Sequence, residues 1–151
     1  MKKFLFVISI FVFVIAFSSV FAVDNIVISP QKVMVNGVQK NFEVYNINGN
    51  NFFKLRDIAY VLNNTDSQFS VNYNSEKQMI EIKKSESYTS VGGEMVTGTD
   101  KSSTAVKSSQ KLLVNNILKD LLAYNVGGNN FFKLRVIPRN LLRLIFMKGL
   151  L

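Results

Sequence analysis

The sequence predicts an α+β fold in which an antiparallel sheet buries one helix. Two observations support this prediction. Hairpin turn signals lie on both sides of a single amphipathic stretch, and a string of twelve residues beside that stretch returns later in the chain. The composition, 48% hydrophobic and 19% charged, is that of a globular chain. The 151 residues suit one domain or two small modules.

The first hairpin is predicted at Asn36-Gly37, because both central positions of a type I′ turn need a positive φ. Residues 32–35 alternate toward a strand before this turn, and residues 38–45 would form the returning strand. The polar residues 48–51 are then expected to form a turn that can cap a following helix.

An amphipathic helix of about three turns is predicted from Phe53 to Leu62, because apolar residues recur mostly three or four positions apart. A second hairpin is predicted from the alternation in 69–73 and 79–82. Residues 98–107, rich in Ser, Thr and Lys, are expected to be a linker.

The internal repeat is the most specific feature of the chain. The string from Tyr45 to Arg56 returns later in the chain as Tyr124 to Arg135, with ten of twelve positions identical. Over the longer ranges 29–56 and 108–135, 16 of 28 positions are identical. The repeat predicts one module at 23–97 and a partial second module at 108–135.

Residues 1–22 have the three parts of a secretory signal: a basic start, an apolar run and small residues before a cleavage site after Ala22. The run is shorter than the roughly 20 residues that span a bilayer, which favours removal over a membrane anchor. Without this segment the net charge is +6, and residues 23–120 are nearly neutral at +1. We therefore expect a secreted protein, with cell-wall association as one alternative, and no nucleic-acid partner.

The residue types present exclude several chemistries. The chain has no Cys, His or Trp, so it cannot form disulfides, Cys or His metal sites, or an imidazole base. Ser29-x-x-Lys32 matches the spacing of serine acyl-enzymes, but it enters a strand and has no companion motif. Glu76 and Glu81 could suggest a glycosidase pair, although charged surface residues explain them better. We expect no catalytic residues, no metal and no cofactor.

Aromatic residues next to cations within the repeated string form the candidate surface motif. In one interpretation they stack on sugar rings or bind an anionic wall polymer. In the other, which we favour, one Phe of each pair lies in the core and Arg56 pairs with Asp57 or Asp24 on the surface. The candidate residues are Asn50, Asn51, Phe52, Lys54 and Arg56 in the first copy, and Asn129, Asn130, Phe131, Lys133 and Arg135 in the second.

The string Y-N-I-x-G-N-N-F-F-K-L-R-D-I-A, from Tyr45 to Ala59, resembles the copper amine oxidase N-terminal domain-like, or stalk, domain of exported proteins from low-GC Gram-positive bacteria. Residues 33–37, 68–71 and 88–93 are similar to that domain as well. The resemblance implies about five antiparallel strands curled around one helix. It does not imply amine oxidation, because histidines of a separate catalytic domain hold the copper in those oxidases.

Similarity between the two copies stops after Arg135, and Pro138 would break the helix expected there. The segment 136–151 is also much shorter than 57–97, the segment to which it would correspond. We interpret 136–151 as a divergent basic and apolar tail, and we hypothesise a frameshift near codon 136. A basic amphipathic membrane helix is the less favoured alternative.

Together these features predict a secreted, non-catalytic module of the cell envelope rather than an enzyme. It would act as a spacer or as a binding domain for wall polymer or another surface protein. The alternative is a truncated remnant, or a regulatory part, of a larger exported hydrolase. Membrane contact is expected through the signal peptide or, less favoured, through the basic tail.

Overall fold

The computed structural model describes residues 24–133. The predicted signal peptide, Arg135 and the tail from 136 lie outside this range. Within it the fold is mostly antiparallel sheet with one α-helix, which confirms the predicted α+β class at this level. None of the helices in this range is long and apolar enough to cross a membrane.

The helical elements are α1 (Leu55–Leu62) and the 3-10 helix η1 (Ser102–Thr104). The strands are β1 (Ile26–Ile28), β2 (Val33–Val35), β3 (Val38–Lys40), β4 (Val44–Ile47), β5 (Asn50–Lys54), β6 (Phe69–Asn74), β7 (Met79–Lys84), β8 (Val106–Ser108), β9 (Lys111–Val114), β10 (Ile117–Lys119), β11 (Ala123–Val126) and β12 (Asn129–Lys133).

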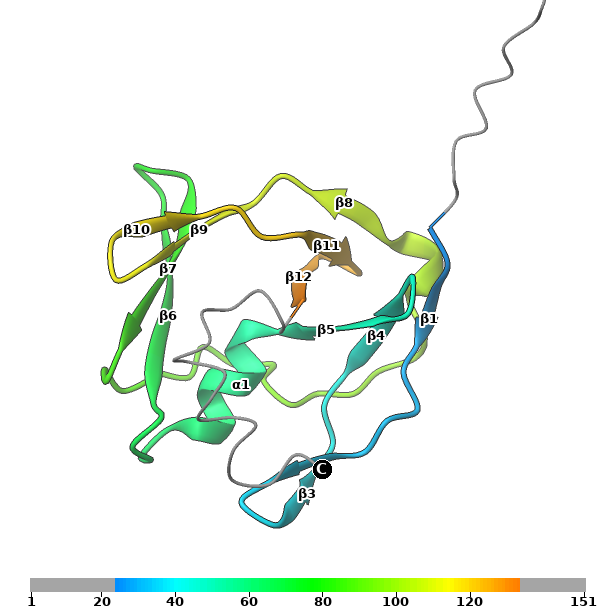
Figure 1. Cartoon of the computed structure of the whole chain (residues 1–151), viewed down its shortest axis with the longest axis horizontal. Helices are drawn as coiled ribbons and strands as arrows, with labels where there is room; N and C mark the ends of the chain where they lie inside the picture. The colour runs from blue at the N-terminus through cyan, green and yellow to red at the C-terminus, as the bar shows by residue number, and fades with distance from the viewer. Residues whose placement is uncertain (1–23, 134–151) are drawn as a thin grey trace, which may run out of the picture.

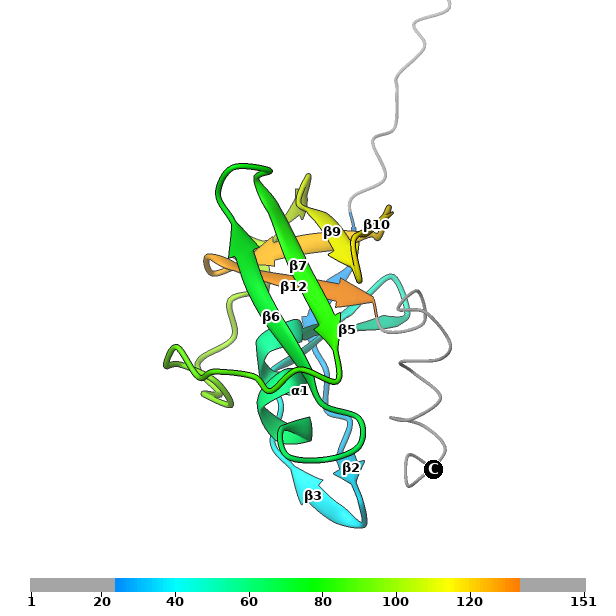
Figure 2. The ribbon, with the colours of Figure 1, turned by 90° about the vertical axis from the view of Figure 1, so that its left-hand side faces the viewer.

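The strands form a curled six-stranded sheet, a four-stranded sheet and a separate hairpin (Figure 1). The six-stranded sheet has the order β1-β4-β5-β12-β11-β8, and the four-stranded sheet has the order β10-β9-β7-β6. All described pairings are antiparallel except that of β7 with β9. Helix α1 contacts β5, β6 and β12. Figure 2 shows the hairpin β2–β3 at one end of the molecule and β9–β10 near the other.

The two copies of the repeat meet in the middle of the six-stranded sheet. There β5 pairs with β12, and Phe53 lies opposite Phe132, its own equivalent in the second copy. Phe52 lies opposite Lys133, and Lys54 lies opposite Phe131, so the two halves are related by an approximate twofold axis through the Phe53–Phe132 pair. We call this β5–β12 pairing the seam.

Pairings on either side of the seam have the same register in both copies. Val44 pairs with Phe53 as Ala123 pairs with Phe132. In the same way Ile28 pairs with Tyr45, and Lys107 with Tyr124. The repeated residues thus build the same three-stranded unit twice, and the seam joins the two units into one sheet.

Two hydrophobic clusters lie on opposite faces of this sheet. One cluster follows the approximate twofold axis, since it contains each of three residues together with its repeat equivalent: Tyr45, Ile47, Phe52, Tyr124, Val126 and Phe131. Across the seam Tyr45 packs edge to face on Phe131 with ring centroids 5.0 Å apart, and Phe52 packs on Tyr124 at 5.4 Å. The other cluster is larger and includes the buried face of α1 with Phe53 and Phe132.

Each copy also contacts the segment that leads into the other copy. The Tyr45 hydroxyl accepts a hydrogen bond from the backbone N–H of Lys101 (3.2 Å), and the Tyr124 hydroxyl donates one to Asp24 (2.7 Å). Burial, together with the hydrogen bond to Asp24, raises the pKa of Tyr124 to about 12. One tyrosine hydroxyl of each copy therefore ties that copy to the segment that leads into the other.

Several local predictions are confirmed. Asn36 and Gly37 have φ values of 51° and 77°, as a type I′ turn requires, and they join β2 to β3. The second predicted hairpin is present as β6 and β7. The predicted helix ends at Leu62, as expected.

Other local predictions were wrong. The helix begins at Leu55 rather than Phe53, and no side chain caps it. Residues 48–51 do not form a helix cap, because Asn48 and Gly49 make a two-residue hairpin turn with φ of 49° and 78°. Phe52 and Phe53 therefore lie within β5, and their side chains enter the two hydrophobic clusters on opposite faces of the sheet.

Three further segments differ from expectation. The strand predicted over 38–45 is divided into β3 and β4, because the chain leaves the hairpin to join the six-stranded sheet. Residues 98–107, expected to be a linker, contain η1 and the beginning of β8. Residues 24–97 form seven strands distributed over three sheets, whereas one sheet of about five strands was expected.

Candidate functional site

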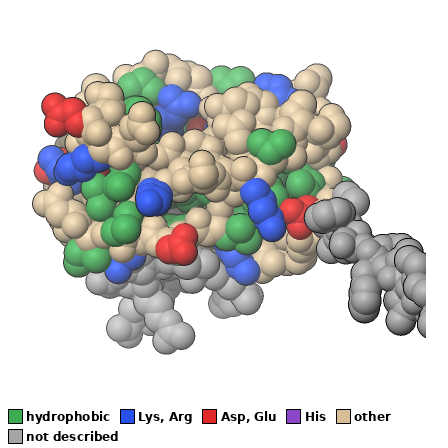
Figure 3. Space-filling view, turned by 90° about the horizontal axis from the view of Figure 1, so that it is seen from above, with side chains coloured by type: hydrophobic (Ala, Val, Ile, Leu, Met, Phe, Trp, Pro, Cys, Tyr) green, Lys and Arg blue, Asp and Glu red, His purple; other side chains and the backbone are tan. Residues whose placement is uncertain are grey.

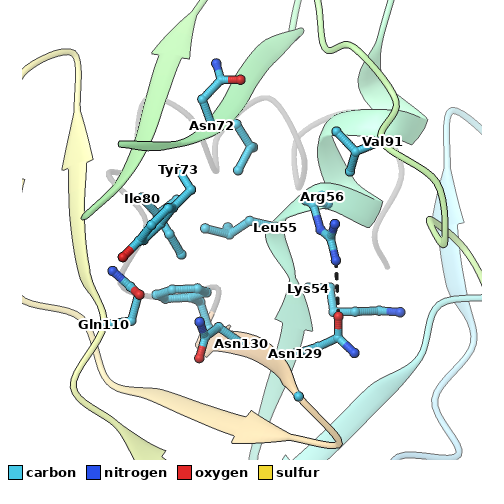
Figure 4. A pocket seen from close by; sticks show the side chains of 13 residues that line it. Lys54, Leu55, Arg56, Asn72, Tyr73, Ile80, Val91, Gln110, Asn129 and Asn130 are labelled. Carbon is cyan, nitrogen blue, oxygen red and sulfur yellow. Dashed lines mark hydrogen bonds between the residues drawn. The ribbon is translucent and has the colours of Figure 1, made fainter. Parts of the chain in front are cut away.

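A cleft of about 360 Å³ lies between the β6–β7 hairpin and the junction of β5 with α1. Both repeat copies line it, because Gln110, just before β9, and residues of β12 with the turn before it face the first copy here. Figure 4 shows Tyr73, Ile80 and Gln110 on one side and Arg56 with Asn129 on the other. The lining residues are Lys54, Leu55, Arg56, Val71, Asn72, Tyr73, Ile80, Val91, Gln110, Gly128, Asn129, Asn130 and Phe132.

Arg56 joins the two copies at the cleft. Its guanidinium Nη2 donates a hydrogen bond to Oδ1 of Asn129 (3.1 Å), which the dashed line in Figure 4 marks. The predicted pairing of Arg56 with Asp57 or Asp24 is wrong, because both carboxylates have other partners. Asp57 contacts Lys54 and Met95, and Asp24 accepts hydrogen bonds from Asn48 and Tyr124.

Tyr73 is the exposed aromatic residue of the cleft, with 60% of its surface accessible. It lies on β6 opposite Ile80 on β7. Its place in a strand was predicted from the sequence, but it was not among the predicted site residues. The alternation Phe69, Val71, Tyr73 predicts a single face, and burial along that face decreases from Phe69 to Tyr73 as the hairpin extends beyond the core.

The chemical character of the cleft is mixed. Val71 and Ile80, which are partly buried, and the exposed Val91 supply apolar surface, and Tyr73 supplies an accessible ring. Four amide side chains, which can both donate and accept hydrogen bonds, surround them: Asn72, Gln110, Asn129 and Asn130. A pocket that combines apolar surface with a few polar groups is typical of small-molecule sites.

The structure divides the ten predicted site residues into several groups. Phe52 and Phe131 are 1% and 0% exposed, so their predicted role in ligand contact is wrong and they belong to the core. Arg135 lies outside the described residues. Those that line the cleft are Lys54, Arg56, Asn129 and Asn130, whereas Asn50, Asn51 and Lys133 do not.

The repeated asparagines hold the hairpin turns in both copies. Asn46 accepts a hydrogen bond from the Gly49 N–H (3.0 Å) and donates one to Asn51 (3.1 Å). Asn125 makes the equivalent bonds to Gly128 and Asn130, at 3.2 and 3.4 Å. These contacts explain why asparagine recurs at these positions without any ligand.

Lys54 lines the cleft, but its ammonium lies in a buried charge network. Its ammonium is 3.0 Å from Oε2 of Glu43 and 3.3 Å from Oδ2 of Asp57, and it donates to the Val96 carbonyl at 3.4 Å. Burial raises the pKa of Asp57, while the hydrogen bond from Met95 and the charge of Lys54 oppose that change. The network therefore fixes the segment around Val96. The Lys54 ammonium is already paired with the carboxylates of Glu43 and Asp57.

Glu94 organises the loop at the rim of the cleft. Its carboxylate accepts hydrogen bonds from the Tyr88 hydroxyl (2.6 Å), the Ser90 hydroxyl (2.7 Å) and the backbone N–H groups of Val91 and Gly92. Desolvation raises the pKa of Glu94, but these hydrogen bonds outweigh it and lower the pKa to about 2. Glu94 thus holds Val91, which lines the cleft, in place.

The other candidates from the sequence have structural roles in the described part of the chain. Glu81 contacts Lys77 at 3.0 Å and accepts a hydrogen bond from Asn74. These two contacts, together with the charge of Lys83, lower the pKa of Glu81. The Ser29 hydroxyl accepts a hydrogen bond from the Gln31 N–H, next to the start of β2.

No family model, curated protein or solved structure matches the chain. The cleft, which the two repeat copies form together, is therefore the basis for a functional proposal.

Proposed function

We propose that this protein is a secreted, non-catalytic module of the bacterial cell envelope that binds wall glycan in the cleft. The observation that supports this most strongly is the combination of an accessible Tyr73 ring with amide side chains and Arg56 in one cleft. The expected secretory signal and the resemblance to stalk domains of exported proteins agree with this proposal. In it, the chain is a stalk-like module followed by an incomplete second copy.

Wall glycan fits the chemistry of the cleft. Sugar rings have apolar faces that can stack on Tyr73, and their hydroxyl and acetamido groups can pair with the side-chain carbonyl of Gln110 and the amide of Asn72. The guanidinium of Arg56 adds one cation for an anionic group of the polymer. A strongly anionic ligand without sugar faces fits less well, because the Lys54 ammonium is already paired with Glu43 and Asp57.

The face of the molecule that is seen from above does not suggest a general polyanion-binding protein. Figure 3 shows Lys and Arg side chains spread over one face among hydrophobic and acidic ones, without a single basic patch. A polyanion-binding surface would instead present clustered cations. Recognition of wall glycan is therefore assigned to shape and hydrogen bonding in the cleft, with charge as a secondary contribution.

Sedimentation with purified Gram-positive cell walls tests the proposal. We expect the purified full chain to sediment with the walls and Tyr73→Ala to reduce the bound fraction strongly. Tyr60→Ala is the matched control, because Tyr60 is also accessible, at 48%, but lies on α1 and does not line the cleft. Absence of sedimentation at low salt, or equal loss in both variants, would contradict wall binding at the cleft.

A further inference from the structure

The two repeat copies contain two equivalent hairpins, but only one of them has a partner strand in the described part of the chain. The hairpins β2–β3 and β9–β10 are equivalent because Val35 aligns with Val114 in the repeat. In the four-stranded sheet, β7 lies beside β9 on the side away from β10. Between residues 24 and 133 no strand lies in the equivalent place beside β2. Figure 2 shows the two hairpins at separate ends of the molecule.

The pairing of β7 with β9 shows what such a hairpin accepts. The two strands run parallel, with Ile80 opposite Leu112 and Ile82 opposite Val114. Both β9 residues are covered, with Leu112 0% and Val114 5% exposed. An added strand with alternating apolar residues thus completes the core against this hairpin.

Two side chains at the ends of β9 hold β7 in this register. Gln110 donates its side-chain N–H to the Gln78 carbonyl (3.0 Å). At the other end Asn115 donates its backbone N–H to the Ile82 carbonyl (2.9 Å), and its side chain accepts the Lys84 N–H (3.0 Å). None of these three contacts is needed for the hairpin itself, because each reaches β7 or its flanking residue Gln78.

The first copy retains the residues that make these contacts. Gln31 and Asn36 are the equivalents of Gln110 and Asn115, and Lys32 and Val35 are the equivalents of Lys111 and Val114. Val33 and Met34, which replace two leucines, keep the apolar character of the strand. The sequence of β2 therefore preserves the parts of β9 that contact a partner strand.

The geometry of the β2–β3 hairpin directs backbone groups toward this edge. The turn Asn36-Gly37 makes Val35 and Val38 the first hydrogen-bonded pair, so the next pair, Met34 and Gln39, directs its N–H and C=O groups outward. The groups of Met34 lie on the β2 edge, and those of Gln39 lie on the opposite edge of the hairpin. Such an edge is a template for strand addition.

We propose that β2 accepts a parallel strand from a partner polypeptide that carries a strand of the β7 type. Like β7, the partner strand has apolar side chains at two alternate positions, which correspond to Ile80 and Ile82. Charged residues lie between and after these two positions, as Glu81 and Lys83 do in β7. Its backbone pairs with Met34, and Gln31 and Asn36 hold its two ends. The partner is another protein rather than a second copy of this chain. Each described copy contains two acceptor hairpins and one donor strand, and that donor is already paired with β6 and β9.

The test uses a labelled synthetic peptide with the sequence of residues 75–86, which contains β7. Fluorescence anisotropy should show that the peptide binds the purified full chain, whereas a scrambled peptide does not. Met34→Pro removes the outward N–H of β2 and should weaken binding about tenfold or more. Gln39→Pro removes an N–H from the opposite edge of the same hairpin, so it is the matched control and should leave affinity within about twofold.

A second measurement keeps the proposal testable if Met34→Pro does not fold. Hydrogen exchange on the unmodified chain should show slower exchange at the amides of Met34 and Asn36 when the peptide is added. Absence of binding, binding that Met34→Pro leaves unchanged, or protection confined to β9 would each overturn the proposal. Glycan binding at the cleft does not involve β2, so failure here leaves the function proposed above unaffected.

Discussion

Replacing Lys54 with methionine is the sharpest perturbation of the buried charge network. The methionine keeps most of the apolar stem of Lys54 but removes the ammonium that lies 3.0 Å from Glu43 and 3.3 Å from Asp57. Both carboxylates then remain buried without their cation. Removing one partner of a buried ion pair typically costs about 3–5 kcal/mol. A domain of this size is stabilised by about 5–15 kcal/mol in total, so the loss should be a large fraction of its stability.

Urea unfolding followed by circular dichroism measures this loss. Lys133→Met is the matched control, because Lys133 is the repeat equivalent of Lys54 and the positions equivalent to Glu43 and Asp57 are Leu122 and Val136. The control should change the free energy of unfolding by about 1 kcal/mol or less. Similar free energies for wild type and Lys54→Met at pH 7, or equal losses in the two variants, would refute the assigned role of the network.

The pH dependence provides an independent check with a fixed sign. Asp57 has a raised pKa in the folded state, so its contribution to stability is fully present below its unfolded value of 3.8 and is lost as the pH rises through the folded pKa. Removing Lys54 should raise the pKa of Asp57 further. The stability deficit of Lys54→Met should therefore be largest at neutral pH and shrink as the pH falls. A deficit that grows on acidification would contradict this reasoning.

Three further predictions concern the seam, the rim loop and the charge network. Phe132→Ala, at the centre of the seam, should lower the free energy of unfolding by about 3–5 kcal/mol in urea titrations. Glu94→Gln should lower the urea midpoint above pH 4.5, with the difference from wild type vanishing as the pH falls to about 2, the folded-state pKa of Glu94. Asp57→Asn should raise the urea midpoint at pH 7, because it removes a buried charge whose pKa is raised while Lys54 keeps Glu43 as its counter-charge; a lower midpoint would contradict this.

Features encoded by neighbouring residues could be predicted from the sequence. The turn Asn36-Gly37, the end of the helix at Leu62 and the hairpin of β6 and β7 each depend on a few consecutive residues. Phe53 was wrongly assigned to the helix because a short apolar run fits a helix or a strand equally well, and Phe52 was wrongly named as a surface residue. Each ring has its own core on opposite faces of the sheet, and only the tertiary structure shows both cores.

The seam and the cleft could not be predicted, because they depend on residues far apart in the chain. The repeat showed that two similar units exist, but not that Phe53 pairs with Phe132 or that β7 pairs in parallel with β9. The contact of Arg56 with Asn129 spans 73 positions. Four of the ten candidate residues from the repeated string line the cleft, whereas the string's other asparagines and its phenylalanines are largely explained by turns and core packing.

An NMR titration tests the central claim most directly. Soluble fragments of Gram-positive wall glycan would be added to the ¹⁵N-labelled full chain while backbone amide shifts are recorded. Binding in the cleft predicts the largest changes at Tyr73, Gln110 and Asn129, which three separate elements bring together there. Absence of shifts at saturating glycan, or changes confined to residues away from the cleft, would contradict the proposed function.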